Sequence, residues 1–365
     1  WKPDQQRETL EPYVSLTNEN ADSDLIIWPE TAVPAFNDQV ETDFLLPLRN
    51  SMRAKGISLV RGIPVLDRTQ WDYYNAIISL DQPGRFYYKV HLVPFGEFLP
   101  LRDWLASVLS FLPVPQSDFK SGDLDQPLLV AAGYPIGASI CYEIAFGEEL
   151  IHTLPEAAFL INISNDAWFG DSLAPHQHLE MARMRARETE RDLLRATNTG
   201  ISAVINADGR VVARTAQFEM ATVTRQVQPR SGATPYVIWG NWPVVLLVAG
   251  LLLVVWRTGR KNDAEQAREA GRSTMVLAGA DRAGRFNGGI GAHLPVFAGV
   301  LAVCALYSRA YLGARSGGRR VDRPGAAPAT CRAVYRTFAR AGDIDWPAGA
   351  FLATAGHRAW LCGRR

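Results

Sequence analysis

A stretch without a charged side chain, YVIWGNWPVVLLVAGLLLVVW at positions 236–256, most strongly limits what this chain can fold into. A helix that crosses a bilayer needs about 20 consecutive apolar residues. Trp239, Trp242 and Trp256 lie near the ends of the stretch, as aromatic side chains do at a membrane interface. The sequence therefore predicts a transmembrane helix over 236–256, against the alternative of a helix buried in a protein core.

The charges that flank this stretch indicate its orientation. The basic sequence RTGRK follows at positions 257–261. Because basic residues are retained on the cytoplasmic side of a membrane, residues 1–235 are predicted to lie outside the cytoplasm. The chain is thus divided into a domain over 1–235, the transmembrane helix and a tail over 257–365.

The tail differs from the rest of the chain in composition. From position 262 it has 15 Arg, no Lys and seven acidic residues, whereas the whole chain has a net charge of only +1. Runs such as ARSGGRR and RPGAAPAT are typical of disordered chain. The apolar segment at 294–307 is compatible with a short second span or an interfacial piece. We assign the tail no function.

Apolar periodicity and turn residues in the domain over 1–235 predict strands alternating with helices. The turn at Asp208-Gly209 is a strong hairpin signal. Strands are expected at 24–28, 57–66, 75–80, 85–93 and 157–164 and in hairpins within 127–143 and 201–214, and helices at 41–55 and 176–198. The pattern predicts an α/β fold of stacked layers with a mixed sheet.

Cys141 is the only cysteine before the tail. Four cysteines in a chain of this length do not form a disulfide framework. A lone cysteine is either a buried apolar filler or a reactive thiol. Composition alone favours the filler, so the residues around Cys141 must decide.

Three ionisable side chains lie in or directly after apolar strands. Glu30 stands in IIWPETAVP, Lys89 in YYKVHLVPFGEFLP and Cys141 in SICYEIAF. Singly, each has a structural explanation: a helix-start acid, a snorkelling lysine and a filler thiol. Together they supply the base, the cation and the thiol that a cysteine nucleophile requires. Glu97 and Glu143, in the same segments, are candidates for supporting roles.

The order Glu30, Lys89, Cys141 resembles the Glu-Lys-Cys triad of the nitrilase superfamily. Six longer motifs are similar to the apolipoprotein N-acyltransferases of Gram-negative bacteria: IIWPETAVP, HLVPFGEFLP, ICYEIAFGE, ISNDAWFGDSLAPHQHLEMARMRARE, LLRATNTGISAVI and TPYVIWGNWP. Six such motifs in order make the resemblance specific, and it covers roughly residues 1–260.

The resemblance implies a four-layer αββα sandwich that faces the periplasm from the bacterial inner membrane. In the family, a bundle of membrane helices precedes the sandwich and one closing helix follows it. The closing helix coincides with 236–256. The chain starts with WKPDQQRETL, which has neither an initiator Met nor a signal peptide. We therefore expect the C-terminal part of such an enzyme, without the bundle and without the first strand of the sandwich.

The resemblance also implies an activity, the transfer of an acyl chain from a phospholipid to the α-amino group of a diacylglyceryl-cysteine lipoprotein. Cys141 would be the nucleophile, Glu30 the base, and Lys89 with the Tyr142 N–H the oxyanion donors. Glu97 and Glu143 would support them. No metal, no organic cofactor and no nucleic-acid partner is expected.

The residues that would bind substrate are less well specified. Trp28, Phe95 and Trp168 are candidates for lining an acyl path, although aromatic side chains there are more often plain core. His176 and His178 are two positions apart, so they do not share a helix face, and they are interpreted as structural.

Two other functions stay open at this point. A soluble nitrilase-type amidase would keep the triad and use water as the second nucleophile. An inactive membrane-anchored fragment would bind lipid or lipoprotein without turnover. The apolar span speaks against the first, and the intact triad speaks against the second.

Overall fold

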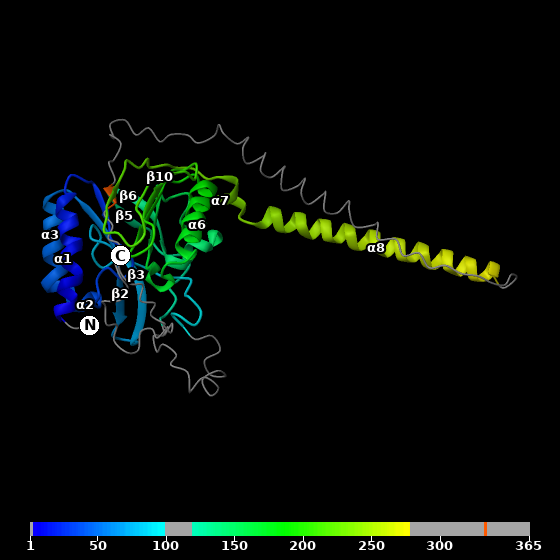
Figure 1. Ribbon diagram of the computed structural model, residues 1–365, viewed down its shortest axis with the longest axis horizontal. Helices are drawn as coiled ribbons and strands as arrows, with labels where there is room; N and C mark the ends of the chain where they lie inside the picture. The colour runs from blue at the N-terminus through cyan, green and yellow to red at the C-terminus, as the bar shows by residue number, and fades with distance from the viewer. Residues whose placement is uncertain (1–2, 99–118, 278–331, 334–365) are drawn as a thin grey trace, which may run out of the picture. The chain divides into compact units, whose positions relative to one another are not determined.

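A computed structural model of the protein describes residues 3–98, 119–277 and 332–333 (Figure 1). Within these ranges two main sheets pack face to face, and helices cover the outer face of each sheet (Figure 1). The predicted four-layer αββα sandwich is confirmed.

The first sheet contains four strands in the order β1-β2-β3-β4. They are β1 (Leu25–Ile27), β2 (Ser58–Asp67), β3 (Asp72–Ser79) and β4 (Phe86–Tyr88). β1 runs parallel to β2, and the other neighbours are antiparallel. Beyond β1 the chain stays beside β2, because the Pro29 carbonyl accepts a hydrogen bond from the Gly62 N–H at 3.3 Å. This pairing holds the following residue, Glu30, at the end of the strand.

The second sheet has six strands in the order β10-β9-β8-β7-β6-β5. The central strands β6, β7 and β8 are parallel, and antiparallel hairpins close both edges. The bounds are β5 (Leu129–Ala131), β6 (Tyr134–Ile140), β7 (Phe159–Ser164), β8 (Leu193–Thr197), β9 (Ala203–Ile205) and β10 (Val211–Arg214). The parallel centre brings the carboxyl ends of β6 and β7 to the same edge, where Cys141 follows β6.

Helices complete the outer layers. α1 (Pro3–Glu19), α2 (Asn37–Val40), the π-helix η1 (Glu41–Leu45) and α3 (Leu46–Ala54) lie on the first sheet, and α6 (Ala174–Thr189) lies on the second. Short helices follow the strands of the second sheet: η2 (Cys141–Ala145), α5 (Gly147–Leu150), η3 (Ile151–Thr153) and η4 (Asp166–Phe169). α1 was not predicted.

Three hydrophobic clusters join the four layers. The largest lies between the sheets and includes Ile27, Val60 and Ile163, all fully buried. A second joins α1 and α3 to the first sheet, and a third joins α6 to the second sheet. The site-bearing strand ends are therefore fixed by packing on both faces of each sheet.

Two predicted elements were wrong in extent. The helix expected over 176–198 ends at Thr189, because Glu190 adopts a left-handed conformation with φ 50°. The following residues Leu193 and Leu194 form the buried strand β8, and a short apolar run does not distinguish a buried strand from a helix. The strand expected over 85–93 is only β4. The Lys89 N–H still donates to the Asn75 carbonyl of β3 at 2.8 Å, and the strand assignment ends before it.

The apolar stretch predicted as one helix over 236–256 is divided between two helices. α7 (Pro235–Trp239) ends before Gly240, whose φ is +55°, and α8 begins at Trp242 and continues to Leu277. Tyr236, which lies in α7, is buried. α8, described by itself, contains one segment, Trp242–Arg268, that is long and apolar enough to cross a membrane.

Part of the tail pairs with the domain. β12 (Arg332–Ala333) runs antiparallel to β11 (Val223–Thr224). The predicted apolar segment at 294–307 and the tail cysteines Cys304, Cys331 and Cys362 lie outside the described residues.

Gly62 lies where β2 comes close to the chain that follows β1. A Cβ there would lie 2.7 Å from the Glu30 Cα and 2.8 Å from the Ile163 Cδ1. Gly62→Ala should therefore lower the stability of the domain by about 1–3 kcal/mol, the usual cost of overpacking. Thermal unfolding in detergent measures it. Gly259→Ala on α8, where a Cβ meets nothing within 4 Å, is the matched control. Equal midpoints for both variants would contradict this close approach.

Candidate active site

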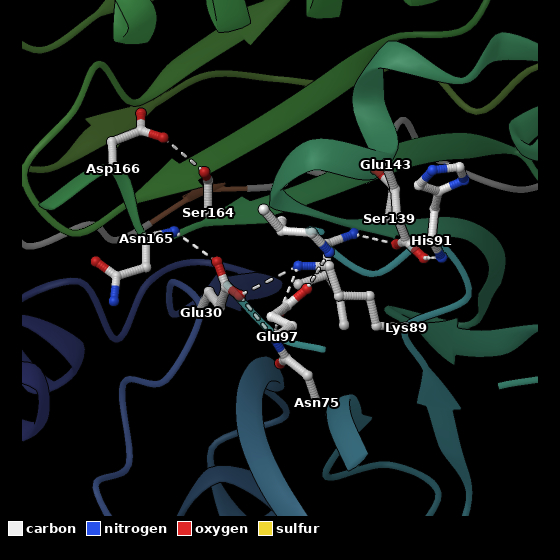
Figure 2. Close-up of polar contacts among 12 residues, drawn as sticks. Glu30, Asn75, Lys89, His91, Glu97, Ser139, Glu143, Ser164, Asn165 and Asp166 are labelled. Carbon is white, nitrogen blue, oxygen red and sulfur yellow. Dashed lines mark hydrogen bonds and ion pairs between the residues drawn. The ribbon is translucent and has the colours of Figure 1, made fainter. Parts of the chain in front are cut away.

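Glu30 lies in the turn that follows β1 and is 5% exposed. Its carboxylate is held from two sides: the Asn75 amide donates to Oε1 at 2.7 Å, and the Asn165 N–H donates to Oε2 at 2.7 Å (Figure 2). The Asn198 amide donates to the Glu30 carbonyl at 3.1 Å. Donors from both sheets therefore fix the carboxylate between the sheets.

Lys89 stands directly after β4 and is 1% exposed. Its Nζ lies 2.8 Å from Glu97 Oε1 and 3.8 Å from Glu30 Oε1. Glu97 also accepts from the Val93 N–H at 2.8 Å, which closes the loop that carries both residues. Figure 2 shows the ammonium between the two carboxylates. Glu97 thus orients Lys89, and Lys89 is shared by both acids.

Cys141 follows the last residue of β6 and begins η2. Its φ is +52°, in the left-handed region that side chains other than Gly rarely occupy. The thiol is buried and hydrogen-bonded to Ser164 at the end of β7. This sharp turn directs the thiol to the edge where the strands of both sheets end.

Electrostatic coupling joins the three predicted triad residues. The pKa of the Cys141 thiol is raised to about 12, first by burial and then by the Glu30 carboxylate, while Lys89 acts in the opposite direction. Burial also raises the pKa of Glu30, although Lys89 lowers it. Burial alone would lower the pKa of Lys89, but Glu30, Cys141 and Glu97 raise it. The thiol therefore keeps its proton at neutral pH unless an adjacent base removes it.

Glu143 joins the cysteine turn to the Lys89 loop. Its Oε2 accepts from the Ile140 N–H at 2.6 Å and from the Tyr87 hydroxyl at 3.1 Å. Its Oε1 accepts from the Val90 N–H at 2.5 Å and from the His91 N–H at 3.1 Å (Figure 2). Burial raises the pKa of Glu143 to about 7, against these N–H donors. Glu143 thus holds the turn that carries Cys141 against the loop that follows Lys89.

A polar group behind the thiol was missed by the sequence reasoning. Asp166 Oδ1 accepts from Ser164 Oγ at 2.7 Å and lies 3.3 Å from His178 Nδ1, and Asp166 Oδ2 pairs with Arg195 at 2.9 Å. Arg195 holds the pKa of Asp166 well below its usual value, even though burial raises it. Asp166 follows a strand end, as Glu30 and Cys141 do, and that shared position was a usable signal.

The remaining predicted residues occupy different environments. Trp28 is fully buried, stacks on Tyr13 at 5.2 Å and donates to Thr17 Oγ1 at 3.0 Å, so it belongs to the α1 core. Phe95 and Trp168 are 60% and 48% exposed. Tyr142 follows the nucleophile candidate and packs edge-on against neighbouring aromatic rings. Those rings belong to His91 and Phe146.

The sequence matches a family model over its entire sandwich. Residues 1–236 match the model described as carbon-nitrogen hydrolase. The chain belongs to the carbon-nitrogen hydrolase family. A nitrilase-like fold is therefore expected, and the two sheets with their outer helices have it.

Curated relatives share more than the fold. The chain is 52% identical over 272 residues to a protein of Methylococcus capsulatus named apolipoprotein N-acyltransferase, across 74% of this chain and 54% of that protein. It is 39% identical over 274 residues to a Vibrio parahaemolyticus protein of the same name, across 72% of this chain and 54% of that protein. The chain thus spans about half the length of the curated relatives that it matches.

Solved structures are more distant. A nitrilase-superfamily member from Saccharomyces cerevisiae aligns with 20% identity and a TM-score of 0.42, over 56% of this chain and 77% of that one.

Proposed function

We propose that the protein is an apolipoprotein N-acyltransferase that works through an acyl-thioester on Cys141. The observation that carries the proposal is the buried group of Glu30, Lys89 and Cys141 in a chain 52% identical to a protein of that name. The acyl donor would be a membrane phospholipid and the acceptor a diacylated lipoprotein. An inner-membrane location, with the domain facing the periplasm, fits the apolar segment Trp242–Arg268 and the basic residues within and after it.

The first half-reaction is acyl transfer to sulfur. Glu30 takes the thiol proton as Cys141 attacks the ester carbonyl of the phospholipid. The negative charge of the tetrahedral intermediate falls on oxygen, where Lys89 and the Tyr142 N–H would stabilise it. The carbon–oxygen bond of the ester then breaks. The lysophospholipid leaves with the proton returned by Glu30, and a thioester remains.

The second half-reaction moves the acyl chain to nitrogen. The free α-amine of the lipoprotein attacks the thioester and gives a proton to Glu30. The carbon–sulfur bond breaks, the thiolate takes the proton back, and an amide is released. One carboxylate can serve both steps because each step returns it to its starting protonation state. Glu97 and Glu143 act here only by positioning Lys89 and the cysteine turn.

A mass measurement on the Cys141 peptide tests this function. The protein, purified in detergent and mixed with phospholipid, should carry a hydroxylamine-labile fatty acyl group on Cys141, and Cys141→Ala should carry none. A diacylated lipopeptide added afterwards should remove the group and appear as N-acylated product.

Two outcomes would redirect the proposal. An adduct from a short amide, but not from phospholipid, would favour the hydrolase chemistry for which the matched family is named. An unmodified Cys141 with both donors would remove the cysteine from the reaction.

A further inference from the structure

A thiol, a carboxylate and an imidazole converge behind the catalytic group. Cys141 begins η2, Asp166 begins η4 and His178 lies in α6, so three elements of the second sheet's outer side supply them. One potential ligand atom from each lies within 4.8 Å of the other two, and all three residues are buried. The proposed acyl transfer uses neither Asp166 nor His178.

This set of donors suits one class of ligand. Zn²⁺ is bound by Cys, His and carboxylate groups at about 2.0–2.3 Å, with an open fourth position in sites that also admit a small molecule. Tetrahedral ligands at those distances are about 3.3–3.8 Å apart. The three ligand atoms would therefore have to move closer together by about 1 Å to bind an ion, which side-chain rotations allow.

The surrounding charges also favour a dication. Glu30, Glu97 and Asp166 are acids, while Lys89 and Arg195 are the cations that contact them. With these three acids ionised and Cys141 a thiolate, four negative and two positive charges leave an excess of two negative charges, and the buried Glu143 is a further acid near Lys89. A single divalent ion neutralises that excess, whereas a proton on the thiol neutralises only one charge.

We propose that Cys141, Asp166 and His178 form a binding site for a thiophilic divalent cation of the Zn²⁺ class. Binding releases the thiol proton to solvent and forms a metal–sulfur bond. The bound sulfur shares its charge with the metal and is a weaker nucleophile toward an ester. The metal site stands on its own, and only the inhibition of acyl transfer rests on the function proposed above.

Cobalt(II) provides a readout that does not need activity. Titration of the whole chain in detergent with Co²⁺ should give thiolate-to-cobalt charge-transfer absorption in the near ultraviolet, and Zn²⁺ should abolish it by displacement. Cys141→Ser should remove the absorption. His178→Gln should weaken Co²⁺ binding by at least about 10-fold, since even outer-shell changes at metal sites cost 10–100-fold.

Matched variants separate this site from other cysteines and histidines. His152→Gln removes a histidine that pairs with Asp125 at 3.0 Å on the surface, and it should leave the titration unchanged. Absorption that survives Cys141→Ser would come from the tail cysteines and would overturn the proposal. Equal Co²⁺ affinity in His178→Gln and in the parent protein, with both proteins shown to be folded by circular dichroism, would also overturn the proposal. A Co²⁺ site in a chain that forms no thioester would leave the metal site standing and refute only the acyltransferase.

Discussion

Glu30→Gln is expected to slow formation of the Cys141 thioester by about 100- to 10,000-fold, the usual contribution of a positioned general base. The glutamine amide can keep the contact with the Asn165 N–H, which donates at 2.7 Å, but it cannot accept the thiol proton. Single-turnover acylation with phospholipid, followed by mass on the Cys141 peptide, measures the loss. Glu180→Gln, which removes a surface acid paired with Arg183, is the matched control and should leave the rate unchanged.

Glu30→Gln should slow acylation of Cys141 but make its thiol easier to ionise. The Glu30 carboxylate is, after burial, the next cause that raises the pKa of Cys141 to about 12. Without that negative charge the thiolate forms at lower pH, so alkylation of Cys141 by a small neutral reagent should shift to lower pH. Slower acylation together with easier ionisation of the Cys141 thiol would indicate that a base was lost. If the rates of acylation and of alkylation of Cys141 fell together at every pH, the role of Glu30 as the base would be contradicted.

Much of the fold follows from local sequence. Strand β7 and the hairpin turn at Gly209 are placed by apolar runs and turn residues, and both lie where they were predicted. Glu30 and Cys141 could be singled out because both follow buried strands, and functional sites gather at such strand ends. β1 and β6 belong to different sheets, so the packing of the two sheets, which is not a local feature, brings the two residues together. Lys89 was recognised from its motif, since the strand it was assigned to ends before it.

The rest depends on contacts between segments far apart in the sequence. α1 was missed because Pro12 and several polar residues obscure its buried face, which Leu10, Tyr13 and Thr17 form. The left-handed Cys141 could not be predicted, because no residue type at that position requires a positive φ. The pairing of Asp166 with Arg195, 29 residues apart, follows from the parallel register of β7 and β8.

Trp28 illustrates the same limit for substrate binding. An aromatic residue two positions before Glu30, the proposed base, was a reasonable candidate for lining an acyl path. Its ring is instead fully buried against α1, a helix that the sequence did not reveal. Exposed Phe95 and Trp168 stay candidates for the acyl path. Phe95 lies in the loop that carries Lys89, and Trp168 lies three residues after Asn165, whose N–H donates to Glu30.

Lys89→Met should reduce both acylation of Cys141 and the stability of the domain. It removes the only cation that contacts Glu30 and Glu97 among the described residues, and unpairing a buried charge costs about 3–5 kcal/mol. Acylation should fall by at least about 100- to 1,000-fold, as for the loss of one oxyanion donor. Glu30 should also hold a proton more tightly, because Lys89 lowers its pKa.

Charge compensation separates the catalytic effect from the structural one. In the double variant Lys89→Met/Glu97→Gln, the acid that Lys89→Met leaves unpaired at position 97 is replaced by a neutral amide. Thermal stability in detergent should therefore partly return. Acylation should not return, because the positive charge for the oxyanion is still absent. Alkylation of Cys141 should move to higher pH in Lys89→Met, since the lysine lowers the pKa of the thiol. This shift is opposite in sign to that of Glu30→Gln. Recovery of acylation in the double variant would mean that Lys89 serves the fold and not the reaction. If Glu30→Gln and Lys89→Met are both inactive and shift the alkylation of Cys141 to lower and to higher pH respectively, Glu30 and Lys89 have separate chemical roles.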